Sequence, residues 1–374
     1  MKILIIDDAN KTLAPIHSAL KSRQCQLAYT KDPVLGLKTL NKHKFDAIIS
    51  AKEIARTSCE NLIKAVALKF PELVRCALIA ESDSQSEIVQ QLHLNFTSDF
   101  DHQSVVNNVL DLIAQKKKVA NQHIVKMVAK VKTLPSPPKV FLQLNMLLQQ
   151  RNVDSDRIAQ IITQDPALAA KVLQYANNTF VPNGKPLTDI TDAITKIGVE
   201  ALTCIVMTAE LFSQDIHISN FSIINEQIHA LAVARFAASL VSTELKHMAM
   251  LSGLLHSIGK LVLYQTDERK CQQFLLESSG MKDVTELEQK YFSATHCQVG
   301  AYLLHSWNFS KPIIEAVLMH KQPKQLLQSG FGINQAVYLA NTLLSEIKVE
   351  QSFIEHFKLE ESIDKLIDKV QLFK

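Results

Sequence analysis

Four histidines in the C-terminal two thirds of the chain are the residues best suited to chemistry. They are His229, His256, His296 and His320. His256 stands out because it lies inside the apolar run 251–263 and is followed by Ser257. Neutral imidazoles bind divalent metals and titrate near neutral pH. The histidines therefore predict either a metal site, a polar pocket without metal, or ordinary core positions.

The elements that must position these histidines are helices. After residue 138, apolar residues recur at helical spacing and no strand-like alternation is present, so residues 133–374 are predicted to form an all-α domain. Asp165, before Pro166, is expected to cap one helix, and Asn177 with Asn178 to end it. The expected helices are 138–150, 154–164, 166–178, 188–197, 198–213, 219–244, 246–264, 267–278, 283–294, 296–307, 310–320, 332–348 and 360–372.

The N-terminal part has a different rhythm, in which short apolar runs alternate with helical patterns. Strands are expected at 2–6, 26–29, 45–50, 74–79 and 95–97, with helices over 32–41, 57–70 and 83–92 and another from about 102. Five strands alternating with helices predict a doubly wound, flavodoxin-like parallel sheet with its site at the carboxyl ends of the strands.

Asp7 and Asp8 follow the first strand, and this pattern resembles the receiver domain of bacterial response regulators over residues 1 to about 115. The resemblance implies an acidic pair that holds Mg²⁺, a phospho-accepting Asp after strand three, a hydroxyl after strand four and a Lys after strand five. Ala51, Ile79 and Asp99 occupy the last three places. Alanine cannot carry a phosphoryl group, so Asp7, Asp8 and Ala51 are interpreted as a vestigial pocket.

The roles of Ser50 and of the acidic pair in this pocket each have an alternative interpretation. Ser50 precedes the acceptor position by one residue, so its side chain is expected on the opposite face of the strand. Asp7 and Asp8 are expected to be solvated loop acids that cap the next helix; a residual Mg²⁺ site is the weaker alternative, because two carboxylates alone make a poor cage.

Residues 103–132 contain neither Pro nor Gly, and three prolines follow within 135–138. One long helix is therefore expected to connect the halves, ending at the prolines. The lysine run 116–118 is interpreted as a solvated face, with an anion site as the alternative. The predicted organisation is a domain at 1–115, a helical linker at 116–132 and a domain at 133–374.

The helical half resembles the HDOD family, a group of signalling domains related to metal phosphohydrolases but generally lacking their complete metal site. The motifs are Leu-Pro-Ser-Pro-Pro at 134–138, the run 158–178 containing Gln-Asp-Pro-Ala-Leu and Ala-Asn-Asn, and Ile-Thr-Asp-Ala-Ile-Thr-Lys-Ile-Gly at 190–198. The resemblance covers about residues 130 to 330.

The related phosphohydrolases hold metal with an upstream His, an adjacent His-Asp pair and a distant Asp. On this resemblance the corresponding residues are His229, His256 with Ser257, and Asn341, so both carboxylates are missing. Lys260, one turn beyond Ser257, adds positive charge. No metal or other cofactor is therefore expected, and these five residues are interpreted as a vestigial pocket suited to phosphate or carboxylate.

His296 and His320 are candidates for an additional pocket. Related phosphodiesterases often carry paired histidines near the last site, but here Lys321 follows His320, and a cation repels a metal ion.

Composition narrows the function classes. The chain has 374 residues, 47% of them hydrophobic, and a net charge of +3. No nucleic-acid footprint, membrane span or signal peptide is evident, so a cytoplasmic protein is expected. The six cysteines form no Cys-x-x-Cys pair and are expected to be reduced thiols.

Two functions remain. The favoured one is a non-catalytic signal-transduction adaptor that binds signalling proteins through its HDOD module, with a receiver that cannot be phosphorylated. A homodimer is compatible with it, since receivers often pair through their last helices. The alternative is a metal-dependent cyclic-dinucleotide or nucleotide phosphodiesterase with an atypical metal site. A pocket that senses a small ligand is compatible with the adaptor.

Overall fold

The computed structural model describes residues 1–70, 72–80, 88, 91–119, 122–129, 131, 139–148, 155–180, 185–211, 218, 220–307 and 309–373. The contacts divide the chain into two compact units, Met1–Val125 with Leu304–Phe309, and Lys126–Leu303 with Ser310–Lys374. The first division falls inside the expected linker 116–132. The narrower limits at 115 and 133 stay a prediction.

The first unit is built on a five-stranded parallel sheet in the order β2-β1-β3-β6-β7. The strand order reverses at β1, as in doubly wound flavodoxin-like folds, so the predicted fold class is confirmed. The strands are β1 (Lys2–Ile6), β2 (Gln26–Thr30), β3 (Ala47–Ser50), β6 (Val74–Leu78) and β7 (Leu94–Phe96). An additional hairpin, β4 (Glu53–Ile54) with β5 (Thr57–Ser58), was not expected.

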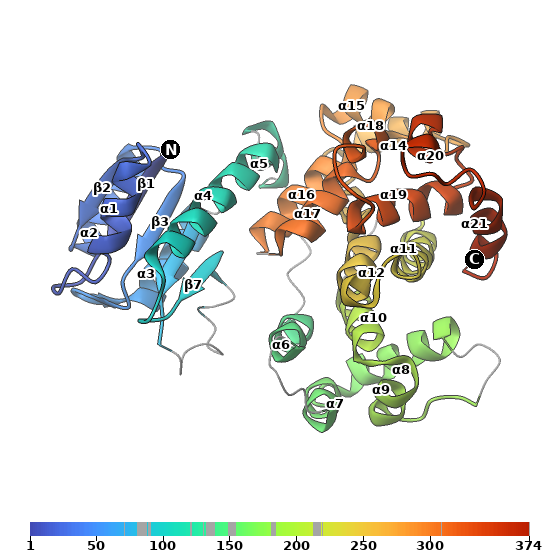
Figure 1. Ribbon diagram of the computed structural model, residues 1–374, viewed down its shortest axis with the longest axis horizontal. Coiled ribbons are helices and arrows are strands. Elements are labelled where there is room, and N and C mark those ends of the chain that lie inside the picture. The colour runs from blue at the N-terminus through green and yellow to red at the C-terminus, as the bar shows by residue number, and fades with distance from the viewer. Residues whose placement is uncertain are drawn as a thin grey trace. The chain divides into compact units, whose positions relative to one another are not determined.

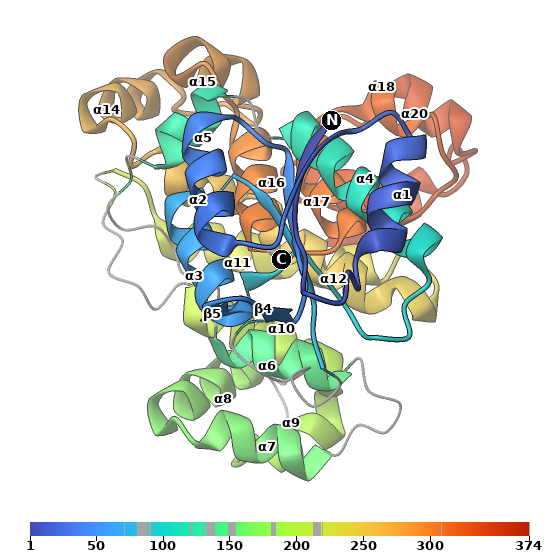
Figure 2. The ribbon, with the colours of Figure 1, turned by 90° about the vertical axis from the view of Figure 1, so that its left-hand side faces the viewer.

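Helices cover both faces of the sheet (Figure 2). Alternate strand residues such as Ile3 and Ile49 face α1 (Ala14–Ser22) and α4 (His102–Val119). Leu4 and Ile48 face the other way, toward α2 (Pro33–Lys42) and α3 (Cys59–Lys69). Because both faces are buried, the central strands β1 and β3 are largely apolar instead of alternating. The expected helix 83–92 lies mostly outside the described residues.

All the regular secondary structure in the described residues of the second unit is helical (Figure 1), which confirms the predicted class. Its helices are α6 (Lys139–Leu148), α7 (Ser155–Thr163), α8 (Pro166–Phe180), α9 (Ile190–Ile197), α10 (Val199–Leu211), α11 (Ile223–Ala238), α12 (Lys246–Leu255), α13 (Ile258–Leu263), α14 (Glu268–Glu277), α15 (Thr285–Phe292), α16 (His296–Ser306), α17 (Lys311–Met319), α18 (Pro323–Leu326), α19 (Ile333–Leu344), α20 (Gln351–His356) and α21 (Ile363–Val370). A 3₁₀ turn covers Thr243–Leu245.

Small residues let the central helices approach closely. A Cβ added to Gly253 of α12 would lie 2.7 Å from the Cα of Ala234 in α11. A buried apolar cluster joins α11 and α12 to Ala316 of α17 and Ala336 of α19. The helices that hold His229, His256 and His320 therefore pack around one core.

Several helix boundaries differ from the expected ones. The single helix expected over 246–264 is broken into α12 and α13 at His256 and Ser257. The expected helix 103–132 is described as α4 and α5 (Gln122–Val128); residues 120 and 121 and the proline motif at 134–138 lie outside the described residues. Asp165 caps α8 as expected, since its Oδ1 accepts the N–H groups of residues 167 and 168.

Asn177 does not end α8, because the helix continues to Phe180. Its side-chain amide instead accepts the N–H of Leu187 at 2.7 Å and donates to the carbonyl of Leu187 at 3.1 Å. The amide thus mimics a backbone group and fixes the segment that leads into α9. A hydrogen bond to a residue ten positions away replaces the expected cap.

Candidate functional site

The acidic pair of the first unit does not form an open carboxylate cage. Asp7 is buried; its Oδ1 accepts the N–H groups of Asp8 and Leu13 at 2.8 and 3.0 Å, and its Oδ2 accepts the Tyr29 hydroxyl at 2.6 Å. Asp8 accepts the N–H and hydroxyl of Thr12. The expectation of solvated acids is therefore wrong for Asp7, although both carboxylates do fix the turn before α1.

Burial and the neighbouring Asp7 carboxylate raise the pKa of Tyr29 to about 12. The phenol thus keeps its proton and keeps donating to Asp7 at physiological pH. The carboxylate oxygen that faces Tyr29 is engaged by a neutral donor rather than by a cation.

Ala51 follows β3 at the position expected for a phosphoryl acceptor. It is buried, and its N–H donates to the Ile6 carbonyl at 2.8 Å. The Ser50 side chain does not take the place of the acceptor. Its Oγ donates a hydrogen bond to the Ala51 carbonyl at 3.0 Å and is also hydrogen-bonded to the Cys59 thiol of α3. Ile79 is buried, and Asp99 accepts the hydroxyl of Thr97. The three positions that correspond to the acceptor, the hydroxyl and the lysine of a receiver are therefore occupied by two apolar side chains and an acid.

In the helical unit, the four candidate histidines lie in a row. The ring centroids of His229 and His256 are 5.5 Å apart, those of His256 and His320 are 5.1 Å apart, and those of His320 and His296 are 5.2 Å apart. His229 lies in α11 and His256 directly follows α12. His296 begins α16, and His320 directly follows α17. The expected vestigial pocket and the expected additional pocket are therefore neighbours.

His229 and Asn341 close one end of this row. Nε2 of His229 lies 3.0 Å from Oδ1 of Asn341, which also accepts the Ser345 hydroxyl at 3.3 Å. An amide oxygen only accepts, so His229 donates from Nε2 and has no lone pair there for a metal. The Nδ2 atom of Asn341 is buried without a hydrogen-bond partner among the described residues.

His256 sits at the break between α12 and α13. Its Nδ1 lies 2.7 Å from the carbonyl oxygen of Gly253, so that nitrogen carries a proton. Burial, followed by the charges of His320 and His229, holds the pKa of His256 well below its usual value. Burial also lowers the pKa of His229. Both rings are therefore neutral at pH 7.

Lys260 and Ser257 both hydrogen-bond to an acid, Glu226, that was not predicted as a site residue. Lys260 Nζ lies 2.8 and 3.0 Å from the two carboxylate oxygens of Glu226, and Ser257 also bonds Glu226. Burial raises the pKa of Glu226, but the charge of Lys260 outweighs it and lowers that pKa to about 2. The only cation expected in the pocket is thus balanced, which disfavours the expected binding of phosphate or carboxylate.

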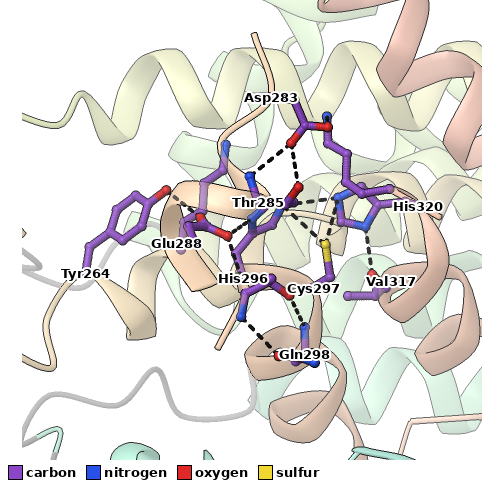
Figure 3. Close-up of polar contacts among 12 residues, drawn as sticks. Tyr264, Asp283, Thr285, Glu288, His296, Cys297, Gln298, Val317 and His320 are labelled. Atoms are coloured by element: carbon purple, nitrogen blue, oxygen red, sulfur yellow. Dashed lines mark hydrogen bonds and ion pairs between the residues drawn. The ribbon is translucent and has the colours of Figure 1, made fainter. Parts of the chain in front are cut away.

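A second buried carboxylate, Glu288 of α15, orients His296 (Figure 3). Its Oε2 accepts the backbone N–H of His296 at 2.9 Å and contacts the ring Nδ1 at 2.7 Å, while Oε1 accepts the Tyr264 hydroxyl at 2.7 Å. Burial opposes ionisation of His296, yet Cys297 and Glu288 raise its pKa to about 10. Glu288 itself has a lowered pKa, because His296 outweighs the effect of burial.

Glu226, Glu288 and Cys297 were not predicted as site residues from the sequence. Glu226 stands one helical turn before His229, and Cys297 directly follows His296, so spacing could have pointed to both. Glu288 has no such signal, since it lies in a polar segment. Residues Ser257 and Asn341 offer no carboxylate, so the metal site of the phosphohydrolases does not fit the residues present.

The HDOD family profile matches residues 134–323, and the chain belongs to the HDOD family. An uncharacterized protein of Treponema pallidum (strain Nichols) is 21% identical over 254 residues, covering 62% of this chain and 47% of that protein. The chain therefore spans about half the length of the curated relative that it matches.

Two solved structures show similar folds. A candidate signal transduction protein from Marinobacter aquaeolei VT8 has a TM-score of 0.55 at 15% identity, covering 90% of this chain and 84% of that one. A candidate phosphohydrolase from Shewanella amazonensis SB2B has a TM-score of 0.50 at 18% identity, covering 68% and 100%. Among the described helices, none combines the length and apolar character required to cross a membrane.

Proposed function

We propose that the chain is a non-catalytic signal-transduction protein that acts by protein–protein interaction through its HDOD module. One observation carries the proposal: His229 donates its Nε2 proton to Asn341, where a phosphohydrolase would direct a lone pair and a carboxylate at a metal. The amide links α11 to α19 through this hydrogen bond. Hydrolysis of a phosphodiester in this pocket would lack the metal that acidifies water and stabilises the transition state.

The first unit supports the same proposal. With alanine at position 51, an acyl phosphate cannot form, and Asp7 is engaged by two N–H groups and a phenol. A receiver that cannot be phosphorylated would act as a docking domain for cytoplasmic signalling proteins rather than as a phosphorylation switch. HDOD family membership favours signal transduction.

The second candidate is a metal-dependent phosphodiesterase with an atypical site. The similarity to the Shewanella amazonensis candidate phosphohydrolase favours it by fold alone. Against it stand Ser257 and Asn341, and the pairing of Glu226 with Lys260 instead of with a metal. Carboxylates contribute much of the charge that holds hard divalent ions, so their loss weakens Mn²⁺, Fe²⁺ and Ni²⁺ binding together.

A hydrolysis assay separates the two candidates. The purified chain should leave cyclic di-GMP intact in the presence of Mn²⁺, Fe²⁺ or Ni²⁺. Restoring both acids, Ser257→Asp with Asn341→Asp, should raise the affinity for these ions if the pocket is a vestige of a metal site. Turnover by the unmodified chain that disappears in His256→Ala would overturn the adaptor proposal and establish the enzyme.

A further inference from the structure

Three potential metal ligands meet beside the row of histidines, at the start of α16 and the end of α17 (Figure 3). The Nε2 atoms of His296 and His320 are 3.2 Å apart, and Sγ of Cys297 lies 3.7 Å from the first and 3.8 Å from the second. All three side chains are buried. None of them belongs to the set formed by His229, Ser257 and Asn341, so this group is a separate site.

The hydrogen bonds of the two rings leave both Nε2 atoms available as ligands. Nδ1 of His320 lies 2.7 Å from the Val317 carbonyl, and Nδ1 of His296 lies 2.7 Å from the Glu288 carboxylate. Both partners only accept, so both Nδ1 atoms carry protons. In the neutral rings, the two Nε2 lone pairs then face each other. Lone pairs at that distance repel unless a positive charge lies between them.

The triangle of ligand atoms has the dimensions of a zinc site. Tetrahedral Zn²⁺, with bonds of about 2.0–2.1 Å to nitrogen and about 2.3 Å to sulfur, separates two nitrogens by about 3.3 Å and a nitrogen from a sulfur by about 3.6 Å. The observed separations of 3.2, 3.7 and 3.8 Å are close to these values. A bound ion would therefore need little movement of the three side chains.

The surroundings match those of a metal site as well. Ligating histidines generally donate their second ring N–H to a carboxylate or a backbone carbonyl, and here one ring does each. Glu288 is itself held by the Tyr264 hydroxyl. The nearby cations are paired, Lys260 with Glu226 and Lys321 with Asp283 at 4.0 Å, which reduces their repulsion of an ion.

We propose that His296, Cys297 and His320 bind one Zn²⁺ ion, with Cys297 as the thiolate and a water molecule as the fourth ligand. The ion joins the start of α16 to the end of α17. A thiolate with two imidazoles selects a borderline-soft ion such as Zn²⁺ over the harder ions of carboxylate sites. The proposal goes beyond the adaptor function and does not depend on it.

The competing arrangement places a proton, instead of an ion, between the two rings. His296 would then be an imidazolium paired with Glu288 and would donate from Nε2 to His320. This arrangement needs no metal and leaves Cys297 a thiol. The two arrangements differ in metal content and in the state of the sulfur, and both are measurable.

The test measures metal uptake by the full chain. Protein stripped with chelator should bind one equivalent of Zn²⁺, and Co²⁺ in its place should give the intense visible bands of a four-coordinate ion together with a sulfur-to-cobalt charge-transfer band. Cys297→Ser should weaken Zn²⁺ binding by more than about 100-fold and abolish the charge-transfer band, whereas Glu288→Gln should weaken it by about 10- to 100-fold. Cys204→Ser, which replaces another buried thiol of the same unit, is the matched control and should bind normally.

Failure to bind Zn²⁺ at one equivalent, or equal binding by wild type and Cys297→Ser, would overturn the site. If Cys297→Ser does not fold, the cobalt spectrum of the wild type still decides, since absence of a thiolate band rules the proposal out. Failure of the adaptor proposal shows up separately, as hydrolysis of cyclic di-GMP that requires His256. Zn²⁺ binding without hydrolysis supports both proposals.

Discussion

Replacing Glu226 with Gln should destabilise the helical unit, because the change leaves Lys260 without its anion. The ammonium lies 2.8 and 3.0 Å from the two carboxylate oxygens. The side chains are only 19% exposed for Lys260 and 11% exposed for Glu226, so water screens the pair weakly. Breaking a buried pair from one side leaves an uncompensated charge, which is the costly case.

The size of this stability loss follows from the pKa shift of the Glu226 carboxyl group. Burial alone would raise the pKa of Glu226, yet Lys260 lowers it from 4.5 to about 2. A difference of that size corresponds to about 3 kcal/mol of folding free energy. We therefore expect Glu226→Gln to lower the free energy of unfolding by about 3 kcal/mol at pH 7.

The stabilisation by Glu226 should depend on pH in a definite direction. A carboxyl group whose pKa is lower in the folded state than in the unfolded state stabilises the fold once it is ionised in both states, which here means above about pH 5. Its contribution is lost as the pH falls from 4.5 toward 2, where the folded form also takes up the proton. The difference between wild type and Glu226→Gln should be constant above about pH 5 and shrink below it.

Urea denaturation followed by circular dichroism measures both effects. Glu277→Gln is a suitable control, since Glu277 pairs with Lys290 at the same 2.8 Å but on the surface, and it should change stability within experimental error. Lys260→Met in the Glu226→Gln background should recover much of the loss, because it removes the unpaired charge. A loss below about 1 kcal/mol for Glu226→Gln, or one that does not depend on pH, would refute the reasoning.

Three further predictions test other parts of the chain. Acetyl phosphate with Mg²⁺ should add no phosphate detectable by intact mass, since Ala51 offers no carboxylate; an adduct labile to hydroxylamine would contradict this. Asn177→Ala should lower the free energy of unfolding by about 1–3 kcal/mol, because it leaves both backbone groups of Leu187 without their partner; a smaller change in urea denaturation would show that water replaces the amide. Gly259→Ala should lower the melting temperature strongly, because the added Cβ would lie 2.0 Å from the carbonyl oxygen that begins α16, whereas Gly330→Ala, with nothing within 4 Å, should not; equal shifts would mean that α13 can move away.

The main chain of the first unit was predictable, because buried parallel strands are short apolar runs. Ile3 to Ile6 and Ala47 to Ser50 need no pairing information to be recognised. The hairpin of Glu53 and Ile54 with Thr57 and Ser58 was missed, since two-residue strands carry no periodicity.

Helix boundaries near the site were not predictable from apolar spacing. The apolar run 251–263 continues through the break at His256, so the pattern gives no sign of it. The imidazole of His256 binds the Gly253 carbonyl within the last turn of α12. Asn177 was misjudged for a related reason, since its hydrogen-bond partner Leu187 lies ten positions further along the chain.

The buried acids beside the histidines carry no apolar signal in the sequence. The four histidines lie close together as a row, yet the buried carboxylates next to them are those of Glu226 and Glu288, which resemble surface residues in the sequence. Glu226 is held by Lys260, and Glu288 is held by His296 and Tyr264. Each acid therefore has a partner within the protein, and these pairings stabilise the packing of the helices that carry them.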